Sequence, residues 1–162
     1  MDRIPSIRLV FILTKNDITD FDRTAVSQRL RIIPTKTCAP ALSKGKVSLN
    51  ADIHEVESEL SGLTILRSES CPYQMIKHAY WSIELPQIEC WGLDKPLQQI
   101  EQILLGKESE IQQLSQEYNL RADLIVRVFA KSNNMPELII PHSGISFFSS
   151  LGTSISFDFY LD

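Results

Sequence analysis

The sequence predicts an α+β domain in which a mostly antiparallel central sheet of about five to six strands carries helices packed on one face. Two observations lead to this prediction. Apolar or alternating segments of strand type occur in neighbouring runs, and stretches with helical periodicity separate these runs. The predicted order along the chain is strand, helix, two or three strands, long helix, strand, helix, strand.

The composition fits one globular domain that spans residues 1–162. Of the 162 residues, 43% are hydrophobic and 22% are charged, which is far from the composition of disordered chains. No apolar run approaches the roughly 20 residues of a membrane helix, and the N-terminus lacks the features of a signal peptide. We therefore expect a cytoplasmic protein. Cys38, Cys71 and Cys90 show no close pairing, so we expect free thiols.

Four internal segments have the pattern of strands. The segment Ile7–Thr14 is almost continuously apolar, which predicts a central strand covered on both faces. The segments 46–53 and 79–85 alternate apolar and polar residues, as half-exposed strands do. In the second of them the alternation puts Tyr80, Ser82 and Glu84 on one side and Trp81, Ile83 and Leu85 on the other. The apolar run 124–130 predicts one more strand.

The C-terminal segment 138–162 is predicted to organise the sheet. Its last run alternates apolar with polar residues, namely Ile155, Phe157 and Phe159 against Ser154, Ser156 and Asp158. We expect this strand to lie deep in the sheet and not at an edge. A short helix with apolar residues at Ile145, Phe148 and Leu151 precedes it and ends at Gly152.

Two other helices follow from capping signals and periodicity. Asp20 or Asp22 is a plausible N-cap for a short helix, which buries Ala25, Val26, Leu30 and the stem of Arg29 and which Pro34 stops. The longest helical pattern covers 97–118. Gly106 lies inside it, and glycine costs roughly 1 kcal/mol relative to alanine in a helix interior. We therefore expect a kink or two consecutive helices that meet there.

The middle of the chain leaves one alternative open. Residues 38–45 and 68–72 have the composition of loops. Between them, residues 46–67 fit a hairpin that turns between Ser58 and Gly62. The apolar residues Ile53, Val56, Leu60 and Leu63 fit a helical stripe equally well.

The two ends of the chain echo each other weakly. The predicted strand 7–14 is followed by a short helix within 25–33. In the same way, the predicted strand 124–130 is followed within 145–155 by a short helix and the start of a further extended segment. This echo predicts two pseudo-repeated halves in a ferredoxin-like arrangement.

Four motifs in this order resemble a bacterial family, the domain of unknown function 4279. They are FILTKNDITDF, LRIIPTKT, YWSIEL before the long helix, and ISFFSSLGTSISFDFYLD. The chain differs from the family pattern at Arg31, where relatives usually have glycine, and in extra residues between Gly45 and Tyr80. The resemblance implies a small cytoplasmic bacterial protein without known catalysis. Some proteins of this kind are similar to immunity proteins, which bind secreted or contact-delivered toxins.

The residues that could do chemistry show no arrangement typical of a catalytic or metal site. His54, His78 and His142 never fall at metal-ligand spacing with a cysteine or carboxylate. Cys71 or Cys90 could pair with His78 only through the fold, and a lone cysteine is more often a small buried residue. There is no glycine-rich phosphate loop. We expect no enzyme activity, no metal and no cofactor.

The charge argues for a protein partner. The net charge of -4 disfavours nucleic acid and anionic membranes and favours a basic partner. The aromatic residues Tyr80, Trp81 and Trp91 are predicted to be core residues, because a stacking platform for nucleic acid normally comes with a basic groove. We expect a monomer, although no pattern in the sequence determines the oligomeric state.

The predicted partner-binding surface is an acidic stretch in the variable middle of the chain. It consists of Asp52, His54, Glu55, Glu57 and Glu59. An exposed hairpin there would offer carboxylates and an open edge to a basic nuclease toxin. Two other hypotheses remain: a small non-catalytic ligand- or protein-binding domain, and a small hydrolase that uses Glu55, Glu57 and His54.

Overall fold

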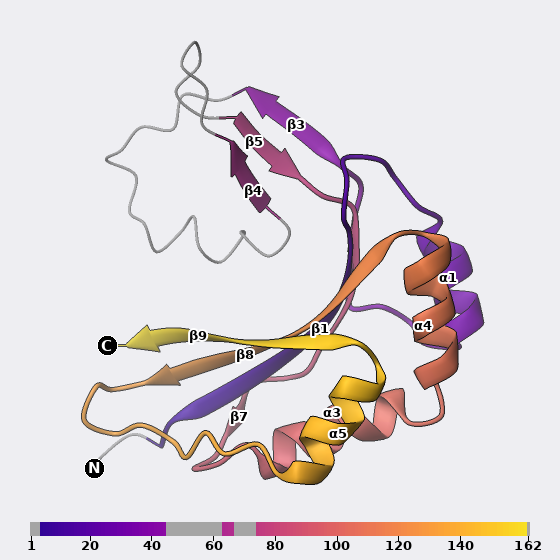
Figure 1. The fold of residues 1–162 in the computed structure, drawn as a ribbon. Helices are drawn as coiled ribbons and strands as arrows, with labels where there is room; N and C mark the ends of the chain where they lie inside the picture. Colours follow the sequence, from indigo (N-terminus) through magenta and orange to yellow (C-terminus); the bar gives the residue numbers. More distant parts are fainter. Residues whose placement is uncertain (1–3, 45–62, 67–73, 162) are drawn as a thin grey trace.

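The chain forms a curved mixed sheet with helices on one face, as predicted (Figure 1). The structure, a computed structural model, describes residues 4–44, 63–66 and 74–161. Its four helices, α1, α3, α4 and α5, all lie on the same side of the main sheet. Among the described residues, no helix has the length and apolar character needed to cross a membrane.

The central strand of the main sheet is β1 (Ser6–Lys15), as its apolar run predicted. From edge to edge the strand order is β2 (Lys36–Cys38), β6 (Tyr80–Glu84), β1, β8 (Leu120–Ala130) and β9 (Thr153–Leu161), and the short β7 (Ile88–Glu89) also pairs with β1. β1 has buried residues on both faces: Leu9 and Phe11 pack under the helices, and Val10 and Ile12 are buried among their neighbours on the other side.

Most strand pairs are antiparallel. Among the named strands that the structure describes, the exception is the pair β8 and β9, which is parallel and connected through α5 (His142–Ser150). The two predicted pseudo-repeats are both strand–helix–strand units, one from β1 to β2 and one from β8 to β9. They lie side by side in the sheet, with β6 between β1 and β2, and are not interleaved as in a ferredoxin-like sheet.

The last strand, β9, lies at the edge of the sheet, so the expectation that it lies deep inside is wrong. It pairs with β8 alone among the described strands. The alternation of its residues explains the position. Ser154 and Ser156 are exposed on one face, and Phe159 and Leu161 remain about half exposed on the other. A strand that needs so little cover is stable at an edge.

The helices begin and end where local signals act. α1 (Arg23–Leu30) begins after Asp22, whose side chain accepts a hydrogen bond from the Ala25 N–H at 2.9 Å. It ends before Pro34, because Arg31 adopts the left-handed conformation with φ of 54°. The prediction that Pro34 stops the helix is therefore wrong.

The long helical pattern is divided, as predicted. α3 (Asp94–Leu104) and α4 (Glu108–Glu117) meet around Gly106, whose φ is +75°. In α5, Phe148 is buried as expected, but Ile145 is 51% exposed. Gly144 takes the inward position instead, and a Cβ atom there would lie 3.1 Å from Glu101 Oε1 of α3.

A second, three-stranded sheet continues the β2 and β6 pair. Its order is β3 (Ala41–Lys44), β5 (Gln74–Lys77) and β4 (Leu63–Leu66). The predicted loop 38–45 is therefore wrong, because β3 follows β2 after only two residues. The hairpin or helix predicted for 46–67 is described only at β4, and its other residues lie outside the described chain, as does the predicted loop 68–72.

The core lies between the main sheet and the helices. Trp81, Phe11 and Phe148 are its largest fully buried side chains. The Trp81 Nε1–H donates a hydrogen bond to Ser27 Oγ of α1 at 2.9 Å. Trp81 is thus a core residue, as predicted. Trp91 is not, because it is 53% exposed in the connection before α3.

Candidate functional site

The face of the main sheet that the helices leave uncovered carries a cluster of charged side chains. We call this side the open face. Because side chains alternate along a strand, the residues between the core positions of β1, β6 and β8 point to it. Arg8, Glu84 and Arg127 are three of them. Register places Arg8 directly opposite Arg127, and Val10 opposite Glu84.

Glu84 holds this charged cluster together. Its carboxylate lies 3.1 Å from Arg8 Nη1, 2.9 Å from Lys36 Nζ and 3.5 Å from Arg127 Nη1. Arg127 Nε also lies 3.7 Å from Asp158 Oδ2 of β9. Like charges directly opposite each other in a sheet are destabilising. Since Glu84 contacts both Arg8 and Arg127, it compensates their repulsion and links three strands.

The surroundings of Glu84 keep it ionised. Its side chain and that of Arg127 are each only 10% exposed. Burial alone would raise the pKa of Glu84, but the hydrogen bond and charge of Lys36, followed by those of Arg8, hold it below the ordinary value of 4.5. A carboxylate with a lowered pKa is a poor proton donor or acceptor near neutral pH. The cluster therefore connects the strands of the sheet through ion pairs.

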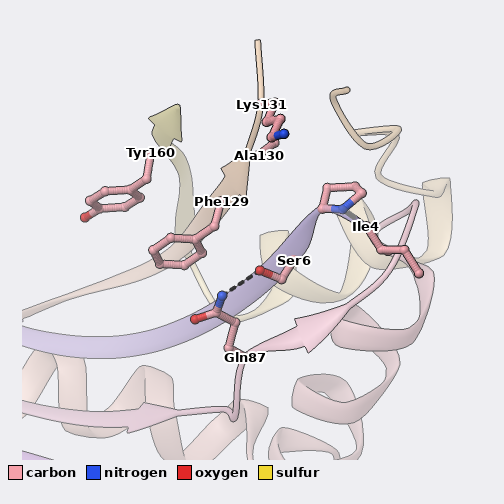
Figure 2. A pocket seen from close by; sticks show the side chains of 8 residues that line it. Ile4, Ser6, Gln87, Phe129, Ala130, Lys131 and Tyr160 are labelled. Atoms are coloured by element: carbon pink, nitrogen blue, oxygen red, sulfur yellow. Dashed lines mark hydrogen bonds between the residues drawn. The ribbon is translucent and has the colours of Figure 1, made fainter. Parts of the chain in front are cut away.

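Next to the charged cluster lies a pocket of about 220 Å³ at the end of β1 and β8. Figure 2 shows the rings of Phe129 and Tyr160 side by side, which stack with centroids 4.7 Å apart. Gln87 Nε2–H donates a hydrogen bond to Ser6 Oγ at 2.5 Å. The pocket is lined by Ile4, Pro5, Ser6, Gln87, Phe129, Ala130, Lys131 and Tyr160.

The polar groups of the pocket are linked by hydrogen bonds. An amide side chain such as that of Gln87 is not basic enough to remove the proton from a hydroxyl group. The contact with Gln87 therefore does not activate the Ser6 hydroxyl as a nucleophile. The other polar atom of Gln87, Oε1, accepts a hydrogen bond from Arg8 Nη2 at 3.1 Å. The pocket can therefore hold a small polar or flat group, with Lys131 at its rim.

On the helical side of the molecule, α3 and α4 carry more acidic than basic residues. From Asp94 to Glu117, α3, α4 and their connection contain five carboxylates and only two lysines, Lys95 and Lys107. Two apolar residues are exposed among these acids, Ile103 at 36% and Leu105 at 68%. We call α3, α4 and their connection the acidic helical layer.

Part of the acidic helical layer is held in place by α1. Arg29 forms ion pairs with Glu110 and Glu117 of α4. The hydrogen bonds that Arg29 donates to Glu117 and then to Glu110 raise the pKa of Arg29. Glu101 faces inward between α3 and α5, and burial raises its pKa. Asp94 and Glu108 are the remaining carboxylates of the layer.

The residues predicted as the partner-binding site lie outside the described chain. These residues are Asp52, His54, Glu55, Glu57 and Glu59. The hydrolase hypothesis uses three of them, so the structure does not test it. Cys38 and Cys90 are free thiols, as predicted, while Cys71 is also outside. Within the described ranges, no group of three or more histidine, cysteine or acidic residues could hold a metal ion.

His78 and Cys90 are each placed by the surrounding fold. His78 Nδ1 lies 3.1 Å from the backbone oxygen of Asp17, which joins the β5–β6 connection to the turn before α1. Burial raises the pKa of the Cys90 thiol, and a thiol with a raised pKa is less reactive.

Sequence reasoning missed the charged cluster on the open face. One signal was present: Arg8 and Arg127 are the only charged residues inside two otherwise apolar strand segments, IRLVFILT and LIVRVFA. Charged residues inside such strands are rare unless they are paired. Their pairing partner, Glu84, could be found only from the strand register.

Comparison with known protein families gives a match over most of the chain. A family model described as "Domain of unknown function (DUF4279)" matches residues 6–162. Neither the curated proteins nor the solved structures include a match to the chain. The matched range contains both sheets, all four described helices and the open face.

Proposed function

Because this chain belongs to the family described as domain of unknown function DUF4279, whose description names no activity, we propose a function from its surfaces: it is an immunity protein that binds and neutralises a cognate basic toxin. The observation that carries the proposal is the acidic helical layer, whose five carboxylates outnumber its two lysines together with Arg29 of α1, which pairs with two of them. A nuclease toxin needs a cationic surface to bind phosphates. An acidic partner can cover that same surface.

The acidic helical layer combines charge with apolar contact area. Complementary charge accelerates encounter between two proteins, and buried apolar side chains then slow their separation. Ile103 and Leu105 are exposed among the carboxylates and offer such apolar contacts. Arg29 fixes Glu110 and Glu117 before binding, which reduces the entropy lost on binding. The acidic segment Asp52–Glu59 remains a second proposed contact.

The first experiment tests whether a complex forms. The protein is mixed with the C-terminal domain of the product of the neighbouring gene, and binding is measured by calorimetry at about 50 and 300 mM salt. We expect a complex with a Kd below the micromolar range that weakens at high salt. No complex in the micromolar range, or a neighbouring product without toxic activity, would overturn the proposal.

The second experiment locates the binding surface by charge reversal. Asp94→Lys with Glu108→Lys should weaken toxin binding at least tenfold, mainly through a slower association rate. Glu89→Lys with Glu137→Lys changes the net charge equally at exposed sites outside the layer and should weaken binding far less. Glu55→Lys with Glu57→Lys tests the acidic segment. Equal effects of all three pairs would mean that only net charge matters and would reject a defined acidic surface.

The pocket on the open face favours a second candidate function, that of a non-catalytic ligand-binding domain. Its stacked Phe129 and Tyr160 rings and its rim residue Lys131 suit a small flat acid. Thermal shifts with a panel of small aromatic carboxylates test this candidate. A shift that Lys131→Ala removes, together with no toxin binding, would favour the ligand-binding function over the immunity function.

A further inference from the structure

The outer edge of β9 lacks the features that normally protect an edge strand. Protected edges are short, carry lysine or proline, or contain a bulge. β9 has nine residues, TSISFDFYL, without lysine or proline. Its register with β8 runs unbroken from Ala122 opposite Thr153 to Ala130 opposite Leu161. Its one charged residue, Asp158, lies 3.7 Å from Arg127 on β8, so its charge is compensated.

The apolar side of β9 becomes more exposed toward its C-terminal end. Ile155 and Phe157 pack partly against the core. Phe159 and Leu161 are 48% and 52% exposed. The rings of Phe157 and Phe159 stack with centroids 6.4 Å apart. The exposed apolar surface of β9 is therefore continuous with its partly buried apolar surface.

We infer that β9 is a self-association site, where a second copy of this chain adds its own β9 in the antiparallel direction. The twofold axis passes at Phe157, the middle residue of the nine. Antiparallel pairing about this residue is self-complementary. On the helix side it places Phe157 opposite Phe157, Ile155 opposite Phe159 and Thr153 opposite Leu161. On the open face it places Ser156 opposite Asp158 and Ser154 opposite Tyr160.

Neighbouring registers fit less well. A twofold axis at Asp158 would place two carboxylates opposite each other, which is unfavourable. An axis at Ser156 would leave the last two residues of each strand, Tyr160 and Leu161, without a partner. The axis at Phe157 pairs all nine residues and sets no like charges opposite each other.

The position of α5 also suits this register. α5 ends two residues before β9 begins, so it lies beside the start of the strand and not beside its exposed end. Antiparallel pairing brings the exposed Phe159 and Leu161 of one copy to the start of the partner strand. The partner's α5 lies beside that start, and its Ile145 is 51% exposed. In this register the exposed apolar end of each β9 lies at the start of the partner's β9, next to the partner's α5.

The expected dimer is weak, because nine paired residues form a small contact compared with the roughly 1,200–2,000 Å² of stable interfaces. Sedimentation or light scattering at about 10 to 500 μM protein should show a mass that rises from 18.4 kDa toward twice that value. Phe159→Lys should keep the protein monomeric across this range. Ile33→Lys, at an exposed apolar residue outside β9, should leave the dimer unchanged. A mass that stays monomeric for the unaltered protein would overturn the inference.

A crosslinking experiment tests the register independently of variant stability. In a background where the three native cysteines are serine, Phe157→Cys places a thiol opposite its own copy across the twofold axis. It should form an intermolecular disulfide at least tenfold faster than Ser154→Cys, whose partner residue is Tyr160. Equal rates at both positions would reject the register. Because neither experiment involves a toxin, its outcome is independent of the proposed function.

Discussion

Arg31 holds a backbone conformation that suits glycine. Its φ of 54° and ψ of 40° end α1, and its side chain is exposed. Left-handed conformation costs roughly 1–2 kcal/mol for a residue with a Cβ atom, while glycine loses more entropy on folding. We expect Arg31→Gly to raise the free energy of unfolding by about 0.5–1 kcal/mol in urea denaturation. Arg31→Ala keeps the Cβ atom and should give no gain. An equal gain with alanine would show that the arginine side chain causes the cost.

Glu84 is the residue on which the charged cluster depends. Glu84→Gln leaves Arg8 and Arg127 opposite each other without a carboxylate between them. Removing one partner of a buried ion pair costs about 3–5 kcal/mol, and we expect about 2–3 kcal/mol because Arg8 and Lys36 reach solvent. Urea denaturation measures this loss.

Asp123 provides the matched control for Glu84. It pairs with Arg121 at 2.7 Å on the same face, but Arg121 is 61% exposed. Asp123→Asn should therefore cost less than about 1 kcal/mol. If both substitutions have the same cost, the burial of the Glu84 network has no influence on stability.

Among the elements, the α3–α4 junction depends on Gly106. Its φ is +75°, and nothing lies within 4 Å of where a Cβ atom would be. Gly106→Ala should therefore lower the free energy of unfolding by about 1 kcal/mol through backbone strain alone. Gly106→Asn should cost less, because asparagine tolerates this conformation. Thermal unfolding monitored by circular dichroism compares the two, and no loss with alanine would mean that the junction can continue as one helix.

Elements with strong local signals were predictable from the sequence. Gly106 predicted the division of the long helix into two. The apolar run around Leu9 predicted the central strand. The edge position of β9 was not predictable, because alternation reports one covered face but not the number of neighbouring strands. β3 and β5 are four residues each, too short for a periodicity signal, and β3 lies beside Pro40.

For the molecule as a whole, three carboxylates with a lowered pKa make folding less favourable at acid pH. A hydrogen bond from the Thr19 side chain, followed by one from its backbone, lowers the pKa of Asp17. For Asp20, burial acts to raise the pKa, but hydrogen bonds from Arg23 and the Phe21 N–H lower it overall. The pKa of Glu84 is lowered as well. Their ionised forms stabilise the fold above the ordinary values of 3.8 and 4.5, and this stability is lost as pH falls through the lowered values.

We therefore expect the urea midpoint to fall as pH drops below about 4.5, and to fall less steeply in Glu84→Gln. Glu101 gives a control of opposite sign. Burial raises its pKa, so its protonation at acid pH favours the folded state. Glu101→Gln should make the acid loss steeper. A midpoint that is flat from pH 6 to 3 would contradict the assigned directions.

Only the overall charge of the molecular surface was predictable from the sequence. The net charge of -4 indicated an acidic surface, but its division into an acidic helical layer and an open face with paired arginines follows from the sheet register. Arg8 and Glu84 are 76 positions apart in the sequence and meet only in the folded sheet.

The central position of β1 has a consequence during synthesis. This strand ends at Lys15, while its neighbour β8 begins only at Leu120, roughly a hundred residues later. At about 5–20 residues per second, a ribosome needs about 5–20 s to make that interval. Throughout that time this apolar central strand has one long side unpaired. A nascent chain with this strand order completes its main sheet only once the second half has been translated.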